Sequence, residues 1–232
     1  MKKLLLVLAF IGTGYVLYAQ DSVPPVKSTA SGLTKYSRDY VMLQVGYDGW
    51  AGKPADVKVG GLSRGFNFAL MYDFPVNKSH LSLGAGLGIS TSGMFFNKQR
   101  VGISDTTTQL QFPADSTFKR FKLATTFLEL PLELRFRQYE NNANKGFKAA
   151  IGVKFGTLLN AHTKETGAAA GYKMTEKISN KRFFNSYRIA ATARVGWGNL
   201  SLYGTYSLTP LLKQGAGPAI NPYSIGLCLS GL

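Results

Sequence analysis

The chain has few of the residues that build disulfide frameworks and metal sites. It carries one cysteine, Cys228, and two histidines, His80 and His162. A single cysteine excludes an intramolecular disulfide, and this small set does not make a metal site. A phosphate-binding motif is also missing, because the glycine-rich run at residues 83–88 lies inside a predicted strand with no helix after it. We therefore expect neither a metal nor a cofactor.

Long apolar runs are scarce as well. Beyond residue 20, no stretch approaches the ~20 apolar residues that a helical membrane span requires. At the start of the chain, two lysines precede an almost unbroken apolar run over residues 4–11, and a cleavage site lies next to Gln20. This run is too short for a span, so residues 1–20 are predicted to be a cleaved secretion signal.

Acidic residues are few, with 12 Asp and Glu against 27 Lys and Arg and a formal net charge of +15. An exported chain of this charge is expected to adhere to anionic surfaces, and lipopolysaccharide head groups are the obvious candidate. Nucleic acid is excluded as a partner, because the basic residues are dispersed and the chain is exported.

The remaining sequence is dominated by short segments in which apolar and polar residues alternate, a pattern typical of β-strands. These segments are residues 40–48, 65–74, 81–91, 126–137, 146–158, 186–197, 200–208 and 223–232.

The connections between these segments are alternately long and short. Short turns are predicted at residues 75–80, 138–145 and 198–199, whereas residues 93–120 and 160–184 are predicted to be long loops. Soluble sandwiches have no reason to alternate loop lengths, but outer-membrane barrels have short turns on one side and long loops on the other. The sequence therefore predicts an all-β fold, an eight-stranded antiparallel up-and-down transmembrane β-barrel.

The barrel is expected to span residues 40–232 and to be monomeric, with residues 21–39 as a flexible periplasmic lead-in. Aromatic residues cluster at the strand ends, as interfacial girdles do. The predicted girdle residues are Tyr47, Trp50, Tyr72, Phe74, Phe136, Tyr187, Trp197, Tyr206 and Tyr223. Pro131 lacks a ladder donor, so a bulge or similar irregularity is expected there.

Charged residues alternate with leucines in segment 126–137, and the barrel reading places these charges in the lumen. The residues predicted to point inward are Gln44, Asn67, Asp73, Glu129, Glu133, Arg135, Arg137, Lys148, Lys154, Arg188, Arg194 and Tyr203. Because unpaired buried charges are costly, we expect an ionic network of Glu129, Glu133, Arg135, Lys154 and Arg194. A closed plug is the favoured interpretation, since side chains fill an eight-stranded barrel, and a narrow anion-favouring pore is the alternative.

A catalytic set is not indicated. His80 falls in a predicted periplasmic turn and His162 in a predicted external loop, so the two histidines are expected on opposite sides of the membrane. Thr163 and Glu165 lie beside His162, but a solvated loop histidine is the preferred interpretation. We expect the protein not to be an enzyme.

Three sequence features carry a family resemblance. Residues 127–132 read Phe-Leu-Glu-Leu-Pro-Leu, residues 83–88 form a glycine-rich early hairpin strand, and residues 18–20 read Tyr-Ala-Gln. With these features the chain resembles, over residues 40–232, the small outer-membrane β-barrel family that includes the PorT-like proteins. The resemblance implies an outer-membrane location, and some members of that family support type IX protein secretion and gliding. The chain departs from many barrels in ending on Leu232 rather than on an aromatic residue.

The expected function is a structural or adaptor role at the cell envelope, which for a PorT-like protein would include support of a type IX-like secretion system. Its expected partners are outer-membrane lipid, lipopolysaccharide and proteins of envelope or secretion complexes. A narrow pore and a lipid-modifying outer-membrane enzyme are the rival functions.

Overall fold

The structure, a computed structural model, describes residues 39–76, 79–139, 145–169 and 172–231. The predicted signal at residues 1–20 and all but the last residue of the lead-in lie outside the described residues. The strands of the described part are β1 (Asp39–Ala51), β2 (Arg64–Pro75), β3 (Leu81–Phe96), β4 (Arg120–Arg137), β5 (Phe147–Ala169), β6 (Tyr172–Ser179), β7 (Tyr187–Trp197), β8 (Leu200–Ser207) and β9 (Asn221–Ser230). Within this part, no helix is long and apolar enough to cross a membrane.

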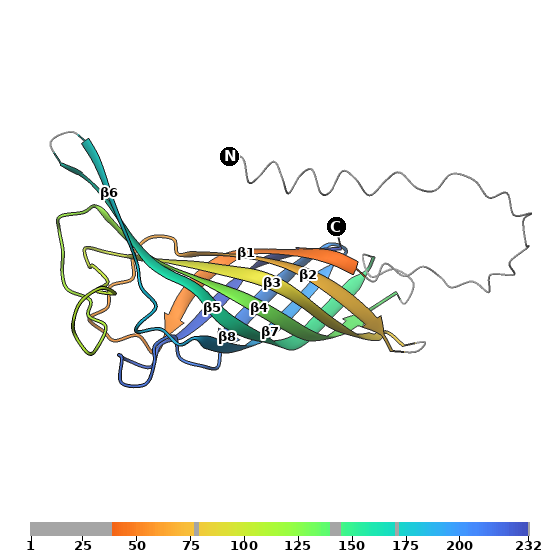
Figure 1. Ribbon diagram of the computed structural model, residues 1–232. Coiled ribbons are helices and arrows are strands. Elements are labelled where there is room, and N and C mark those ends of the chain that lie inside the picture. Colours follow the sequence, from red (N-terminus) through yellow and green to blue (C-terminus); the bar gives the residue numbers. More distant parts are fainter. Residues whose placement is uncertain (1–38, 77–78, 140–144, 170–171, 232) are drawn as a thin grey trace, which may run out of the picture. The chain divides into compact units, whose positions relative to one another are not determined.

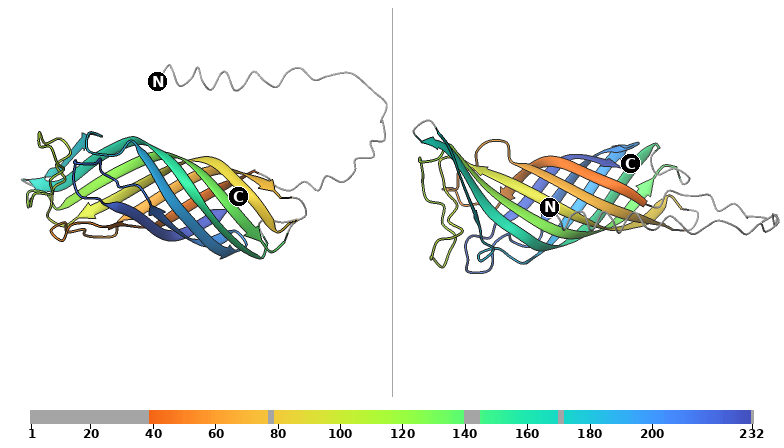
Figure 2. Two further views of the ribbon diagram at one scale, coloured as in Figure 1. Left: turned by 90° about the horizontal axis from the view of Figure 1, so that it is seen from below. Right: turned by 45° about the horizontal axis from the view of Figure 1, so that its top comes forward.

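The strands form one closed antiparallel sheet. Their order is β4-β3-β2-β1-β9-β8-β7-β5, and β4 also pairs with β5, so the sheet returns to its first strand. The strands run obliquely around the barrel axis (Figures 1 and 2). The prediction of an eight-stranded antiparallel up-and-down barrel is confirmed. Strand β6 is additional, because it pairs with β5 alone among the described strands.

Alternation along each strand separates a lipid-facing surface from a lumen. In β4, Leu130, Leu132 and Leu134 are exposed, whereas Glu129 and Glu133 are buried. Successive side chains of a strand point to opposite faces, so one face of β4 is apolar and outward while the other is charged and inward. This is the arrangement of a barrel with lipid outside it.

Glycines on the inner face of β3 leave room for large side chains from the neighbouring strands. A Cβ built on Gly84 would overlap the guanidinium of Arg135, and one built on Gly86 would overlap the sulfur of Met71. Large side chains from β2 and β4 therefore fill the lumen above this glycine face.

Gly152 provides a test of this close packing. A Cβ at Gly152 would overlap the main-chain carbonyl of Leu132 on β4, and backbone cannot move aside as a side chain can. Gly152→Ala is expected to destabilise the barrel by about 1–3 kcal/mol, the usual cost of overpacking. The measurement is the unfolding temperature on unboiled gels. Gly204→Ala is the matched control, since a Cβ at Gly204 would meet nothing within 4 Å. Equal temperatures for the two variants would contradict the packing argument.

Three strand boundaries differ from the sequence prediction. Strand β3 continues to Phe96 and β4 starts at Arg120, so the connection between them is shorter than the predicted loop 93–120. The predicted loop 160–184 instead contains the second half of β5 and all of β6. Residues in this region are polar on both faces because they lie beyond the apolar band. The two-residue apolar period that marks the barrel strands is therefore lost, although the backbone pairing continues.

The bulge lies elsewhere than predicted. Pairing of β3 with β4 keeps one register from Ala85–Leu132 to Gly88–Glu129, on either side of Pro131. The register shift occurs between Thr126 and Phe127 on β4, opposite residues 158–160 of β5. It falls where the barrel ends and the sheet continues as an extension. A bulge increases local bend and twist, which suits a strand pair that leaves the barrel at this point (Figure 1).

The aromatic girdle is confirmed in most positions but is wrong at Trp50. Tyr187 and Trp197 are among the most exposed aromatic residues, as lipid-facing girdle positions require. Trp50 is 7% exposed and packs against Phe96, with ring centroids 5.4 Å apart. Strand β1 continues past the membrane boundary, and Trp50 lies on the inner face of that part of the strand.

Candidate functional site

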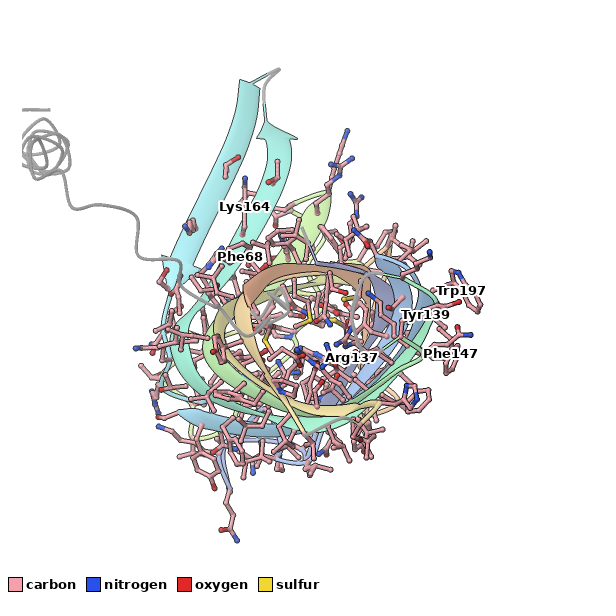
Figure 3. The ribbon with its side chains drawn as sticks, turned by 90° about the vertical axis from the view of Figure 1, so that its right-hand side faces the viewer. Phe68, Arg137, Tyr139, Phe147, Lys164 and Trp197 are labelled. Atoms are coloured by element: carbon pink, nitrogen blue, oxygen red, sulfur yellow. The ribbon has the colours of Figure 1, made fainter. Side chains whose placement is uncertain are left out.

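The lumen contains a first ionic group around Glu133, near the short-turn end. Glu133 Oε2 accepts hydrogen bonds from Arg135 Nε at 2.8 Å and from Arg194 Nη2 at 3.0 Å. Arg135 Nη1 also lies 3.2 Å from Asp73 Oδ1, and Arg137 Nη1 lies 3.0 Å from Asp73 Oδ2. We call these five residues the Glu133 group. Viewed from the short-turn end, Arg137 lies inside the ring of strands (Figure 3).

Pairing register explains how Asp73 enters this group. Asp73 on β2 is paired with Gly84 on β3, and Gly84 is paired with Glu133 on β4. The three residues therefore share one row of the inner face. Because Gly84 has no side chain, Arg135 can lie over it and reach both carboxylates.

A second ionic group surrounds Glu129, further toward the long loops. Arg188 Nη1 lies 3.2 Å from Glu129 Oε1, and Lys154 Nζ lies 3.6 Å from Glu129 Oε2. Lys154 Nζ also donates to Gln44 Oε1 at 3.1 Å, and that oxygen accepts a further hydrogen bond from Asn67 Nδ2 at 3.1 Å. We call these five residues the Glu129 group.

The predicted network thus falls into two groups. Glu133, Arg135 and Arg194 meet in one of them, while Glu129 and Lys154 meet in the other. Sequence reasoning placed Asp73, Arg137 and Arg188 inward but gave them no ionic partners. Their alternation on β2, β4 and β7 was the available signal. The choice of partner required the register between strands.

The lumen carries more cations than carboxylates among the described residues. The buried or half-buried cations are Arg135, Arg137, Lys148, Lys154, Arg188 and Arg194, and the carboxylates are Asp48, Asp73, Glu129 and Glu133. Lys148 Nζ donates to Ser230 Oγ at 2.8 Å. A hydroxyl partner satisfies one donor of this ammonium but does not neutralise its charge.

An apolar cluster closes the long-loop end, and we call it the apolar cap. It combines inward residues at the ends of β1, β3, β4 and β5 with residues from the loops between the strands. Its members are Trp50, Val57, Met94, Phe96, Val101, Ile103, Leu110, Phe121, Leu123, Phe127, Leu158, Ala161, Phe183, Phe184, Leu211, Leu212, Ala216 and Ile220. Sequence analysis did not predict the cap, because its loop residues are scattered over four connections.

A small cavity lies in the lumen between the Glu129 group and the cap. Its volume is about 30 Å³, and its lining combines polar residues such as Asp48, Thr125 and Arg188 with the cap residues Trp50 and Leu123. That volume holds about one or two water molecules. The site as a whole is a filled lumen with paired charges in its middle and an apolar closure above them.

His162 lies in strand β5 and not in the predicted external loop. Its ring Nδ1 is 3.2 Å from Asn160 Nδ2 on the outward face, whereas Thr163 and Glu165 are buried on the inner face. The imidazole and the carboxyl therefore do not converge. Partial burial and the positive charges of Lys177, Lys122 and Lys164 lower the pKa of His162. Burial raises the pKa of Glu165, against the opposing effect of Arg100. His80 lies in the short turn as predicted, with Nδ1 3.0 Å from the carbonyl oxygen of Arg137.

The chain matches one protein family over most of its length. Among solved structures, the crystal structure of Ail, the attachment invasion locus protein of Yersinia pestis, is similar to this chain with a TM-score of 0.37 and 13% sequence identity, covering 84% of this chain and 99% of Ail. No curated protein sequence matches the chain. The family model described as "Outer membrane protein beta-barrel domain" matches residues 32–213, which is most of the chain. With its closed barrel, lipid-facing apolar surface and filled lumen, the protein belongs to the outer membrane protein beta-barrel domain family.

Proposed function

We propose that the protein is a non-conducting barrel with a structural or adaptor role at the cell envelope. In this role the barrel anchors the long loops and the β5–β6 hairpin at the outer face of the membrane, where they contact partner proteins. The observation that carries the proposal is the apolar cap, because it closes the lumen with the same loops that would be presented to partners.

The cap also distinguishes this role from that of a pore. An ion that crossed the lumen would have to leave the polar interior and pass between Phe121, Phe183 and Phe184, which are almost fully buried. Moving an unpaired charge into apolar surroundings costs many kcal/mol. The excess of lumen cations favours the rival anion-favouring pore, which requires the cap to open.

Planar-bilayer recording tests the closed lumen. The purified full chain is expected to show no steady conductance in the absence of a partner. The positive control is a variant with Phe121, Phe183 and Phe184 all changed to serine, which is expected to conduct intermittently and to favour anions. Steady anion-selective conductance of the unchanged protein would refute the closed-barrel proposal and favour the pore.

The hairpin tip allows a test of the adaptor role. Residues 167–169 of β5 and 172–174 of β6 extend past the last β4–β5 pair, Arg120–Thr166. The segment 167–174 can therefore be replaced by an Asn-Gly turn without removing a barrel pairing. Proteins that co-purify from native outer membranes with the unchanged chain are expected to be lost with the shortened chain. Its heat-modifiable migration should stay the same. Identical sets of co-purified proteins would exclude the tip as the contact site.

A more specific form of this proposal is support of a type IX-like secretion system. It rests on the PorT-like motif at residues 127–132, whose glutamate and proline lie in the lumen wall of β4. Components of such a system among the co-purified proteins would support it, and normal secretion by a deletion strain would refute it.

A further inference from the structure

The closed barrel continues at its long-loop end as an open sheet, which we call the sheet extension. It is made of the end of β3, the start of β4, the second half of β5, and β6. Lys122 on β4 is paired with Lys164 on β5, and Lys164 is paired with Lys177 on β6. We call these three residues the lysine row. Like charges directly opposite each other destabilise a sheet, so a row across three strands needs an explanation.

The positive charge of the lysine row, on the outward face of the extension, is not compensated within the described part of the chain. There, none of the three lysines forms a salt bridge with a carboxylate. Glu165 and Glu176 are paired with each other on the neighbouring row, whose side chains point to the opposite face. The lowered pKa of His162, caused in part by the three lysines, indicates the same uncompensated positive potential.

Two arginines enlarge the basic face. Arg120 lies two residues from Lys122 on the same side of β4. Arg64, at the start of β2, also points outward, on the row of Gly93 and Ala124 that neighbours the lysine row. Both side chains are exposed. On the other side of the row, Lys122 Nζ lies 5.6 Å from the ring centroid of Phe95.

An open cleft lies beside the lysine row. Its volume is about 450 Å³, and its lining includes Arg64, Lys119 and Arg120 together with Leu62 and Phe95. A lining that combines cationic side chains with Leu62 and Phe95 suits an amphipathic anion.

The position of the row relative to the membrane identifies the source of such an anion. From the girdle residue Phe136 to Lys122, β4 rises ~33 Å along the barrel axis, for ~3.3 Å per residue and a strand tilt near 45°. The apolar band of such barrels is ~25 Å tall. Lys122 therefore lies above the band, on the lipid-facing side, at the level of lipid head groups.

The hairpin extends in the same direction. Seen along the barrel from the short-turn end, it projects beyond the outline of the barrel, and Lys164 lies on the projecting part (Figure 3). A basic surface that leans outward at this height lies over the surrounding leaflet and not over the lumen.

We propose that the lysine row, with Arg64 and Arg120, binds the phosphate groups of the lipopolysaccharide lipid that surrounds the barrel in the outer leaflet. The phosphates supply the negative charge that the row lacks, and Leu62 and Phe95 of the cleft contact the lipid portion. Bound lipid holds the sheet extension against the membrane surface. This site is separate from the lumen and from the hairpin tip that is proposed to contact partner proteins, although Lys164 and Lys177 lie on the same hairpin.

Titration with lipid A tests the site. The full chain in an uncharged detergent is titrated with bisphosphorylated lipid A, and the dissociation constant is measured by thermophoresis. The triple variant Lys122→Gln, Lys164→Gln and Lys177→Gln is expected to bind about 100-fold more weakly, since each lysine near an anionic surface contributes about fivefold. A control with Lys53, Lys145 and Lys213 changed to glutamine, all exposed and outside both the sheet extension and the cleft lining, should bind like the unchanged chain.

Two further arms identify the ligand. Lipid A from which both phosphates have been removed should bind the unchanged chain as weakly as intact lipid A binds the triple variant, and equal affinity for both lipids would overturn the proposal. Tighter binding of a soluble polyanion such as heparin than of lipid A would overturn it in favour of a soluble ligand. If the triple variant and the control lost equal affinity for lipid A, binding would depend on net charge and not on the lysine row, which would overturn the proposal. Heat-modifiable migration shows that each variant is folded.

Discussion

Glu133→Ala is expected to lower the free energy of unfolding of the barrel by about 3–5 kcal/mol, the cost of breaking a buried ion pair by removing one partner. Glu133 is 3% exposed and accepts hydrogen bonds from both Arg135 and Arg194. Without this carboxylate, Arg194 and Arg135 both lose their ion pairs with Glu133, while Arg135 keeps its ion pair with Asp73. The measurement is the temperature at which the folded band disappears on unboiled gels.

Two variants make this result interpretable. Glu176→Ala removes an exposed glutamate from β6 and is expected to leave the unfolding temperature unchanged. Glu133→Gln keeps the shape of the side chain but removes its charge, so it should fall between the unchanged chain and Glu133→Ala. If Glu133→Ala kept the full unfolding temperature and yet lost partner binding, the lumen would be a functional site and not a stabilising one.

Phe184→Ala is expected to open the apolar cap without unfolding the barrel. Phe184 is 1% exposed, it lies in a loop, and it forms an isolated bridge with Leu212 of another loop. Truncating a buried Phe costs about 3–5 kcal/mol, which corresponds to a population of open cap larger by roughly 10²-fold to 5 × 10³-fold at 1.4 kcal/mol per factor of ten. The measurement is the rate of protease cleavage in the loop at residues 97–119 in intact outer membranes.

Local and global stability should separate in this experiment, because loops and barrel strands open with different free energies. The heat-modifiable shift of Phe184→Ala is therefore expected to stay close to that of the unchanged chain. Tyr187→Ala is the matched control, since Tyr187 is an exposed aromatic three residues away. Unchanged cleavage in Phe184→Ala would show that the cap does not depend on this ring.

Much of the barrel could be predicted from the sequence because side-chain alternation is a local property of an extended chain. Successive residues of a strand point to opposite faces, so Leu130 and Glu133 are assigned to lipid and lumen without knowledge of any other strand. The same rule placed Asp73, Arg188 and Arg194 inward. The lengths of the connections also predicted on which side of the membrane each one lies, since short and long connections alternate in these barrels.

Partner choice within the lumen could not be predicted in the same way. Arg194 and Glu133 are 61 residues apart in the sequence, and they meet only because the barrel closes with one particular register. A different register would bring other inward residues together from the same alternating pattern. For this reason the sequence predicted a single ionic network, whereas the structure contains two separate groups, the Glu133 group and the Glu129 group.

The sheet extension could not be predicted from the alternation of apolar and polar residues either. Residues 160–179 lie where both faces are polar, and a strand without an apolar face has no two-residue hydrophobic signal. Lys122, Lys164 and Lys177 became neighbours through backbone pairing alone. Trp50 was assigned to the wrong surface for a related reason, since an aromatic residue at a strand end fits a girdle and a cap equally well. The barrel and the two faces of its membrane-spanning strands could be predicted from the sequence, because they depend on local chain geometry. The ionic partners, the cap and the lysine row depend on contacts between distant segments, so only the folded chain reveals them.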